Sequence, residues 1–170
     1  TNVSIGGAGA GANAVGGSIA VNFIRNDITA DIRNGADVDA GGKLDLVAQS
    51  SETMIVVAGG GAGSGGNAAG IVVAVNESFI TVEASIKGAL TEVDVANNIQ
   101  VNAADSTTMF VLAVGGAGAL TNAAGAAIAT NNVGNTVSAT IDAAAVNSSA
   151  GSVDVTAGVL PTGTDLNLSI

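Results

Sequence analysis

The sequence predicts an all-β fold, a mainly parallel β-solenoid made of three tandem repeats, and two observations support this prediction. A glycine- and alanine-rich outline occurs three times, each time followed by β-branched residues. Within each copy, aliphatic and polar residues alternate, which is the period of a half-buried strand. The three outlines cover residues 5–22 (IGGAGAGANAVGGSIAVN), 56–76 (VVAGGGAGSGGNAAGIVVAVN) and 111–131 (VLAVGGAGALTNAAGAAIATN).

The copies follow one another at a fixed period. Gly7-Ala8-Gly9 matches Gly61-Ala62-Gly63 and Gly116-Ala117-Gly118, at steps of 54 and 55 residues. A fixed period of this size is typical of stacked units that bury their apolar faces against each other. The repeat positions that we expect to be structural are Gly9, Gly63 and Gly118; Asn13, Asn67 and Asn122; and Asn22, Asn76 and Asn131.

These matches divide the chain, as a single solenoid module, into repeats at 1–54, 55–109 and 110–165, with the start of a further repeat at 166–170. Leu168-Ser169-Ile170 closes the chain at the same phase at which Val3-Ser4-Ile5 opens it. Since the chain opens on Thr1 and has no signal-like segment, we expect a piece of a longer protein. We also expect its two ends to be complementary, so that the partners are flanking repeats or head-to-tail copies.

The alternation assigns side chains to the two faces of the strands. The inward residues are predicted to be Ile28, Ile32, Val82, Ile86, Val137 and Ile141, and the outward ones Asp31, Glu83 and Thr140. A second alternating strand is expected at 44–48, 99–103 and 153–157. Turn-prone pairs separate the two strands at Asn34-Gly35, Gly41-Gly42 and Asn97-Asn98, and Pro161 is expected in a turn.

Several short strands per copy, with a usual coil of about 18 to 27 residues, predict two or three coils in each repeat. On this prediction, equivalent asparagines form a continuous ladder only if intermediate coils also supply asparagine.

The glycine and alanine segment admits three interpretations. As strands with small side chains, it lets opposing sheets approach closely and needs no ligand. As a membrane helix over 56–76 it is disfavoured by its glycines, by Asn67 near its middle, and by the lack of Trp and Tyr in the chain. A phosphate loop or calcium repeat is disfavoured because the required Lys-Ser/Thr or Asp does not follow the glycines.

Composition limits the chemistry that the chain can perform. The formal net charge is −10, with four basic and 14 acidic residues, which disfavours nucleic-acid binding. With no His, Cys or Tyr, carboxylates are the remaining acids, bases or hard ligands, and none recurs at one position in all three copies. We assign no catalytic, cofactor-binding or metal-binding residue. Asp37 with Asp39, or Glu92 with Asp94, could bind Ca²⁺, but a solvated acidic surface is the favoured interpretation.

The motif GAGAG-x-NAAG-x-x-x-AVN, the A-x-I strand and the Val-Asp-Val or Leu-Asp-Leu strand resemble the repeat regions of large bacterial exoproteins. These are filamentous-haemagglutinin-like and leukotoxin-like adhesins of the two-partner and autotransporter secretion routes. The resemblance implies a right-handed parallel β-helix in an extracellular stalk at the bacterial surface, without catalytic residues or membrane insertion, and with a host or cell-surface ligand. The expected function is therefore a structural or adhesive repeat module, with a self-assembling fibre subunit or a carbohydrate-active β-helix enzyme as alternatives.

Overall fold

The computed structural model describes residues 1–159 and 166–169, so the turn predicted at Pro161 lies outside the described residues. All of its regular structure is β-strand, which confirms the predicted fold class. The strands are β1 (Asn2–Ala10), β2 (Asn13–Ile32), β3 (Asp37–Ala40), β4 (Leu44–Ser64), β5 (Asn67–Lys87), β6 (Glu92–Val95), β7 (Ile99–Ala119), β8 (Asn122–Val133), β9 (Thr136–Asp142), β10 (Ala145–Ser148), β11 (Val153–Val159) and β12 (Leu166–Ser169).

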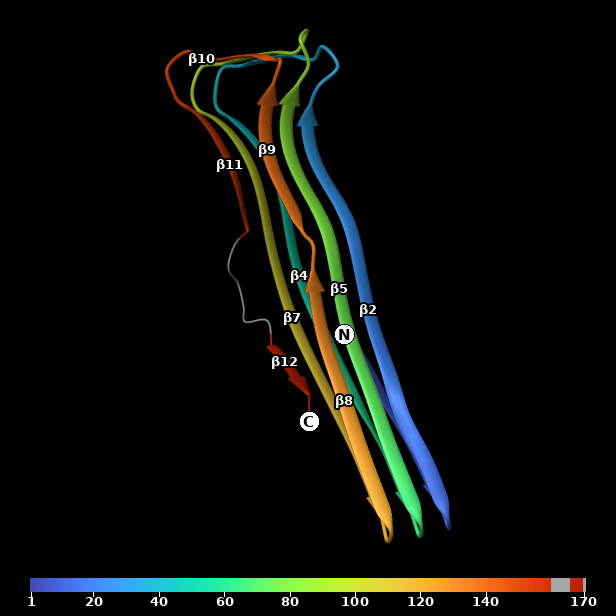
Figure 1. The fold of residues 1–170 in the computed structure, drawn as a ribbon. Helices are drawn as coiled ribbons and strands as arrows, with labels where there is room; N and C mark the ends of the chain where they lie inside the picture. The colour runs from blue at the N-terminus through green and yellow to red at the C-terminus, as the bar shows by residue number, and fades with distance from the viewer. Residues whose placement is uncertain (160–165, 170) are drawn as a thin grey trace.

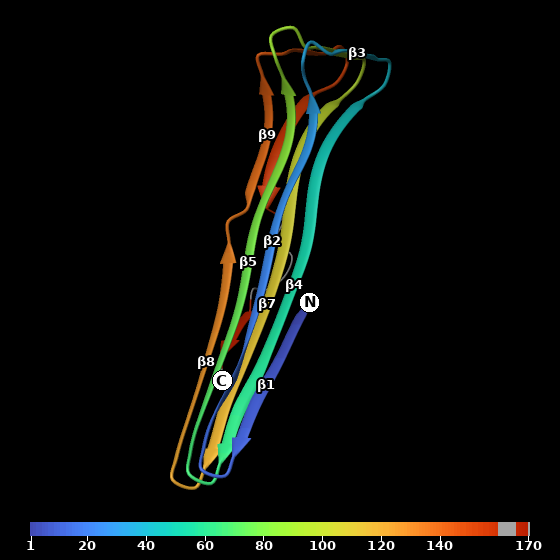
Figure 2. The ribbon, with the colours of Figure 1, turned by 90° about the vertical axis from the view of Figure 1, so that its right-hand side faces the viewer.

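Three parallel sheets form the walls of a flat solenoid. One long sheet has the order β1-β4-β7-β11, with β12 also on β7, and the other has the order β2-β5-β8, with β9 on β5. Figures 1 and 2 show these two sheets running the length of the molecule, joined at one end by tight turns. At the other end the third sheet, β10-β6-β3, closes the coil. We call this closed side the broad end.

Each repeat makes one coil, and the prediction of two or three coils per repeat is wrong. β5 pairs residue by residue with β2 on one side and with β8 and β9 on the other, so direct neighbours are a whole repeat apart. The reason is strand length: β4, β5 and β7 are each 21 residues long, not several short strands. Two such strands and one four-residue strand use up the whole period in a single coil.

The register of the sheets follows the alignment of the sequence copies. Gly7 pairs with Gly61, and Gly61 pairs with Gly116. The two ends keep the same phase, because Val3 pairs with Val57, Val57 with Leu112, and Leu112 with Leu168. β12 therefore pairs with β7 in the register in which β1 pairs with β4, but on the side of the following coil.

The main hydrophobic core fills the broad end, where the three sheets meet. Val82 and Ile86 are fully buried there. Ile28, Ile32, Val137 and Ile141 are partly buried and pack against the same cluster, so the predicted inward residues all face the core. Asp31 and Glu83 alternate with them on the outside. Thr140 shares this outward phase, but its hydroxyl oxygen is buried and has no hydrogen-bond partner.

Towards the tight turns the interior narrows until the two backbones touch. We call this half the blade and define it as residues 2–23, 56–76 and 111–131. A Cβ placed on Gly70 would lie 2.1 Å from the carbonyl oxygen of Gly116 in the opposite sheet, and one on Gly16 would lie 2.4 Å from that of Gly61. Glycine is therefore required at these inward positions, as the small-side-chain interpretation expects.

The turn predicted at Asn34 and Gly35 is present, and residues 56–76 are not a helix. Asn34 and Gly35 both have positive φ, 62° and 73°, as their turn requires. The segment 56–76 forms the end of β4, a turn and the start of β5. In the described part of the chain, no helix is long and apolar enough to cross a membrane.

Candidate functional site

Asparagines form hydrogen bonds across the coils, and no intermediate coil has to supply a further asparagine. The Asn67 side-chain amide donates to Asn13 Oδ1 at 2.9 Å, and that of Asn122 donates to Asn67 Oδ1 at 2.8 Å, which makes a continuous ladder. In the second set, Asn76 Nδ2 donates to Asn131 Oδ1 at 3.1 Å, whereas Asn22 Nδ2 donates to the Ile55 carbonyl at 3.3 Å, so this ladder joins only two coils. Because one repeat is one coil, asparagines a repeat apart are direct neighbours. The ladders therefore hold adjacent coils in register.

Removing the middle asparagine of the first ladder should destabilise the stack more than removing the last one. Asn67→Ala loses two side-chain hydrogen bonds and Asn122→Ala loses one. At about 0.5–1.5 kcal/mol for each bond, and towards the lower end for exposed groups, we expect about 1 kcal/mol for Asn67→Ala and about half that for Asn122→Ala. Urea unfolding measures both values, and equal losses would contradict the ladder.

A ladder of acids lies on the outer face of the broad end. Asp37 pairs with Glu92 and Asp39 with Asp94 across β3 and β6, so like charges face each other on neighbouring strands. Asn147 in β10 continues the second row and donates to Asp94 Oδ1 at 3.1 Å. A small hollow of about 200 Å³ lies along Asp39, Asp94 and Asn147. In the described chain, no group of three or more acids is placed to hold a metal ion.

Neutralising one acid of this ladder tests whether it binds calcium. Like charges on directly opposite strand positions are destabilising, by roughly 0.2–1 kcal/mol. Asp94→Asn keeps a side-chain oxygen for Asn147, and in excess chelator it should raise the melting temperature by a few degrees. If Asp94 helped to bind calcium, added Ca²⁺ would stabilise the wild type more than the variant. Equal melting temperatures of the wild type with and without chelator would count against a calcium-stabilised module.

One ion pair on the outer face of β5 has a clear electrostatic consequence. Lys87 donates a hydrogen bond to the Glu83 carboxylate four residues earlier. This bond lowers the pKa of Glu83 from its ordinary value of 4.5, against the opposing effect of partial burial. Because the folded pKa is the lower one, the stabilisation is present above the unfolded pKa and is lost as pH falls through the folded pKa.

Lys87→Met should therefore raise the pKa of Glu83 towards 4.5, as followed by the carboxyl carbon shift in an NMR titration. The difference in the free energy of unfolding between wild type and variant should shrink as the pH falls through the pKa that Glu83 has in the folded wild type. Lys43→Met, which removes the partner of Asp45 instead, serves as the control and should leave the Glu83 titration unchanged. An unchanged Glu83 pKa in Lys87→Met would contradict the assigned cause.

A buried polar layer separates the core of the broad end from the interior of the blade. Asp105 is fully buried, and its Oδ2 accepts hydrogen bonds from Asn135 Nδ2 at 2.8 Å and from the Thr107 hydroxyl at 3.1 Å. Asn135 Oδ1 accepts from the Ile80 backbone N–H and the Ser78 hydroxyl, both at 3.1 Å. Asn135 lies between β8 and β9, where the strand beside β5 is interrupted. Its side-chain oxygen therefore replaces the backbone carbonyl that would accept the Ile80 N–H in a continuous strand. The sequence does not reveal this layer, because its residues belong to different copies and do not recur.

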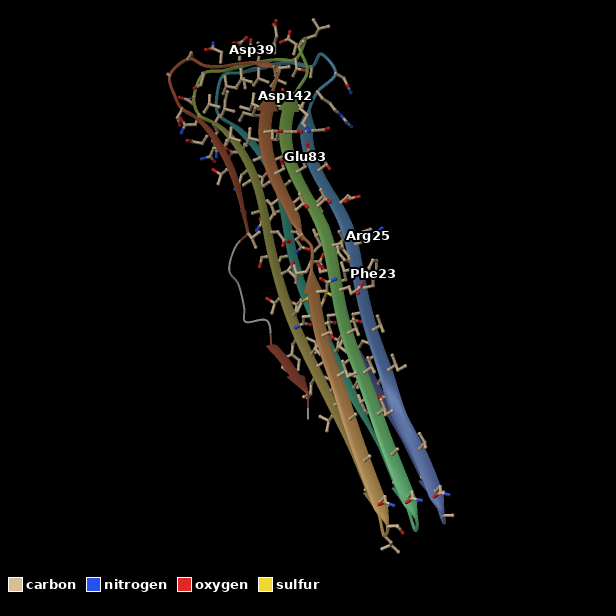
Figure 3. The ribbon with its side chains drawn as sticks, in the orientation of Figure 1. Phe23, Arg25, Asp39, Glu83 and Asp142 are labelled. Carbon is tan, nitrogen blue, oxygen red and sulfur yellow. The ribbon has the colours of Figure 1, made fainter. Side chains whose placement is uncertain are left out.

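The outer face of β2, β5 and β8 changes from charged to aliphatic side chains at the level of Phe23. Towards the broad end it carries Arg25, Asp27 and Asp31, and towards the tight turns it carries exposed aliphatic side chains. The guanidinium of Arg25 lies 5.4 Å from the Phe23 ring centroid and 6.0 Å from that of Phe79, which places a cation on the aromatic pair. Figure 3 shows Phe23 and Arg25 midway along the strands, and Asp39, Glu83 and Asp142 near the broad end.

No family model, curated protein or solved structure matches the chain. The described residues offer hydrogen-bonded ladders, an acidic broad end and an uncharged blade.

Proposed function

We propose that this chain is a structural repeat module of an exported bacterial surface protein, a segment of a rod-like stalk or filament whose outer surface can be adhesive. The main support is the equivalence of repeat and coil. Each copy adds one layer whose strands pair in register with the layers on either side. What the copies share are residues that shape the backbone or bond one coil to the next, and not reactive groups.

The open edges of the stack support continuation into further coils. β2 pairs only with β5, and β8 pairs only with β5, so each has an unpaired outer edge among the described residues. β12 begins a layer in phase with β1. A second copy stacked head to tail would bring its β1 to the position that β12 occupies, since Val3 and Leu168 are equivalent. Continuation by flanking repeats is therefore favoured over a self-assembling fibre subunit.

The test is the growth of the rod with coil number. Duplicating residues 55–109 adds one coil, and small-angle X-ray scattering should show the stack lengthening by about 4.8 Å per added coil at unchanged cross-section. A matched insertion of residues 55–87, which lacks the return strand, should disrupt the fold instead. A cross-section that grows with the duplication would contradict the proposal.

The rival enzyme hypothesis has its own test. The Asp39 and Asp94 carboxylates line one hollow, and a reaction on a polysaccharide would need two such carboxylates. A polysaccharide-degradation screen with the wild type, Asp39→Asn and Asp94→Asn separates the two functions. Degradation that is lost in both variants would replace the structural module by a carbohydrate-active enzyme.

A further inference from the structure

The blade is uncharged, and it carries large aliphatic side chains on its outside. No Asp, Glu, Lys or Arg occurs in residues 2–23, 56–76 or 111–131, so the charged residues all lie outside the blade. The interior of the blade is thin and holds only small and medium-sized side chains, such as Ala74 and the buried Val72. Further aliphatic side chains point outward: Val15 is 75% exposed, Ile19 71% and Ile71 54%.

These side chains form one continuous face on β2, β5 and β8, with a hollow in it. Gly17 leaves a gap between the ridges of Val15 and Ile19, and Ile71 and Val73 border it on the neighbouring strand. The hollow has a volume of about 560 Å³ and is mostly apolar. Ridges beside a hollow that has room for several side chains allow two such faces to pack as two sheets do, about 10 Å apart.

We propose that this face of the blade binds the same face of a second copy of the chain, with the two copies antiparallel. Charge favours this occupant and this orientation. Each chain has a formal charge of −10, carried entirely outside the blade, so contact through the blades brings no charges together. An antiparallel pair also places the two charged ends at opposite ends of the assembly, where their repulsion is weakest. This contact is lateral and goes beyond the proposed stacking of coils.

The size of the face sets the expected strength. Three strands about 4.8 Å apart and about ten residues long, at about 3.3 Å per residue, give a face of roughly 475 Å². Two such faces bury roughly 950 Å² in total, below the about 1,200 Å² at which stable interfaces begin. Three coils should therefore associate weakly, and each added coil enlarges the face by one strand.

The test compares two substitutions on the same strand and the same outward face. Ile71 lies in the blade and Thr81 lies ten residues further on, towards the broad end, and both are exposed positions of β5 away from the sheet edges. We expect sedimentation velocity of the 170-residue chain, up to about 1 mM, to show a monomer–dimer equilibrium that Ile71→Asp weakens at least tenfold and Thr81→Asp leaves unchanged. Circular dichroism checks that both variants keep the wild-type strand content.

Three outcomes would overturn this proposal. The first is a wild type that stays monomeric over the whole concentration range. The second is association that persists in Ile71→Asp, which would place the contact outside this face. The third is binding to phosphatidylcholine vesicles without self-association. The relative orientation of the two copies is measured from the distance between spin labels attached at Thr29→Cys in each copy. An antiparallel dimer predicts a separation between copies of about 70 Å, from ten residues at about 3.3 Å on each side, and a short separation would contradict it. None of these outcomes alters the coil-duplication test of the proposed function.

Discussion

Gly70→Ala should unfold the blade, whereas the same change at Gly116, in the opposite sheet, should be tolerated. A Cβ on Gly70 would lie 2.1 Å from the Gly116 carbonyl oxygen and 3.4 Å from the Gly61 Cα, so two sheets would have to separate to admit it. A Cβ on Gly116 meets nothing within 4 Å. Overpacking against side chains costs about 1–3 kcal/mol, and against rigid backbone we expect the upper end of this range or more.

Gly116→Ala should lie within about 0.5 kcal/mol of the wild type or be slightly stabilising, because alanine has fewer unfolded conformations than glycine. Urea unfolding followed by circular dichroism gives both values. If the two alanine variants were equally stable, the sheets of the blade would not be in contact.

Asn135→Ala is expected to be the most damaging substitution of a polar residue. It removes the acceptor of the Ile80 N–H and one of the donors to the buried Asp105 carboxylate. Each buried polar group that is left without its hydrogen-bond partner costs about 1–3 kcal/mol, and this substitution affects two such groups, so we expect a total of about 3–5 kcal/mol.

Asn132→Ala is the matched control, since Asn132 lies three residues earlier and is exposed. It should change the free energy of unfolding by less than about 0.5 kcal/mol. If Asn135→Ala also fell in this range, the polar layer would be open to water and would not be a sealed part of the interior.

The repeat period and the alternation predicted the fold class and the register of the sheets. Gly7, Gly61 and Gly116 align in sequence and pair in space, because a parallel in-register stack places equivalent residues side by side. The inward positions from Ile28 to Ile141 followed from a period of two for the same reason. These features are local or repeat exactly, so one sequence contains enough information to find them.

The number of coils per repeat could not be read in the same way. Alternation shows that a residue is in a strand but not where the strand ends, and the alternating segment 44–48, predicted as a short strand, is only the start of the 21-residue β4. The polar layer was missed because Asp105, Thr107 and Asn135 converge only after folding. The apolar outer face of the blade was also missed, because both phases of these strands carry apolar residues, such as the buried Val72 and the exposed Ile71, so alternation alone does not say which phase points inward.

The most direct test is the distance between spin labels at Thr29 and Ser138, which are equivalent outward positions in the first and third repeats and both pair with Glu83. The chain has no cysteine, so a double Cys variant can be labelled at these two sites alone, and dilution with unlabelled protein isolates the distance within one chain. One coil per repeat places the two backbones two strand spacings apart, about 9.6 Å, and predicts strong dipolar broadening. Two or three coils per repeat would place them about 19–29 Å apart, and a distance in that range would contradict the one-coil architecture.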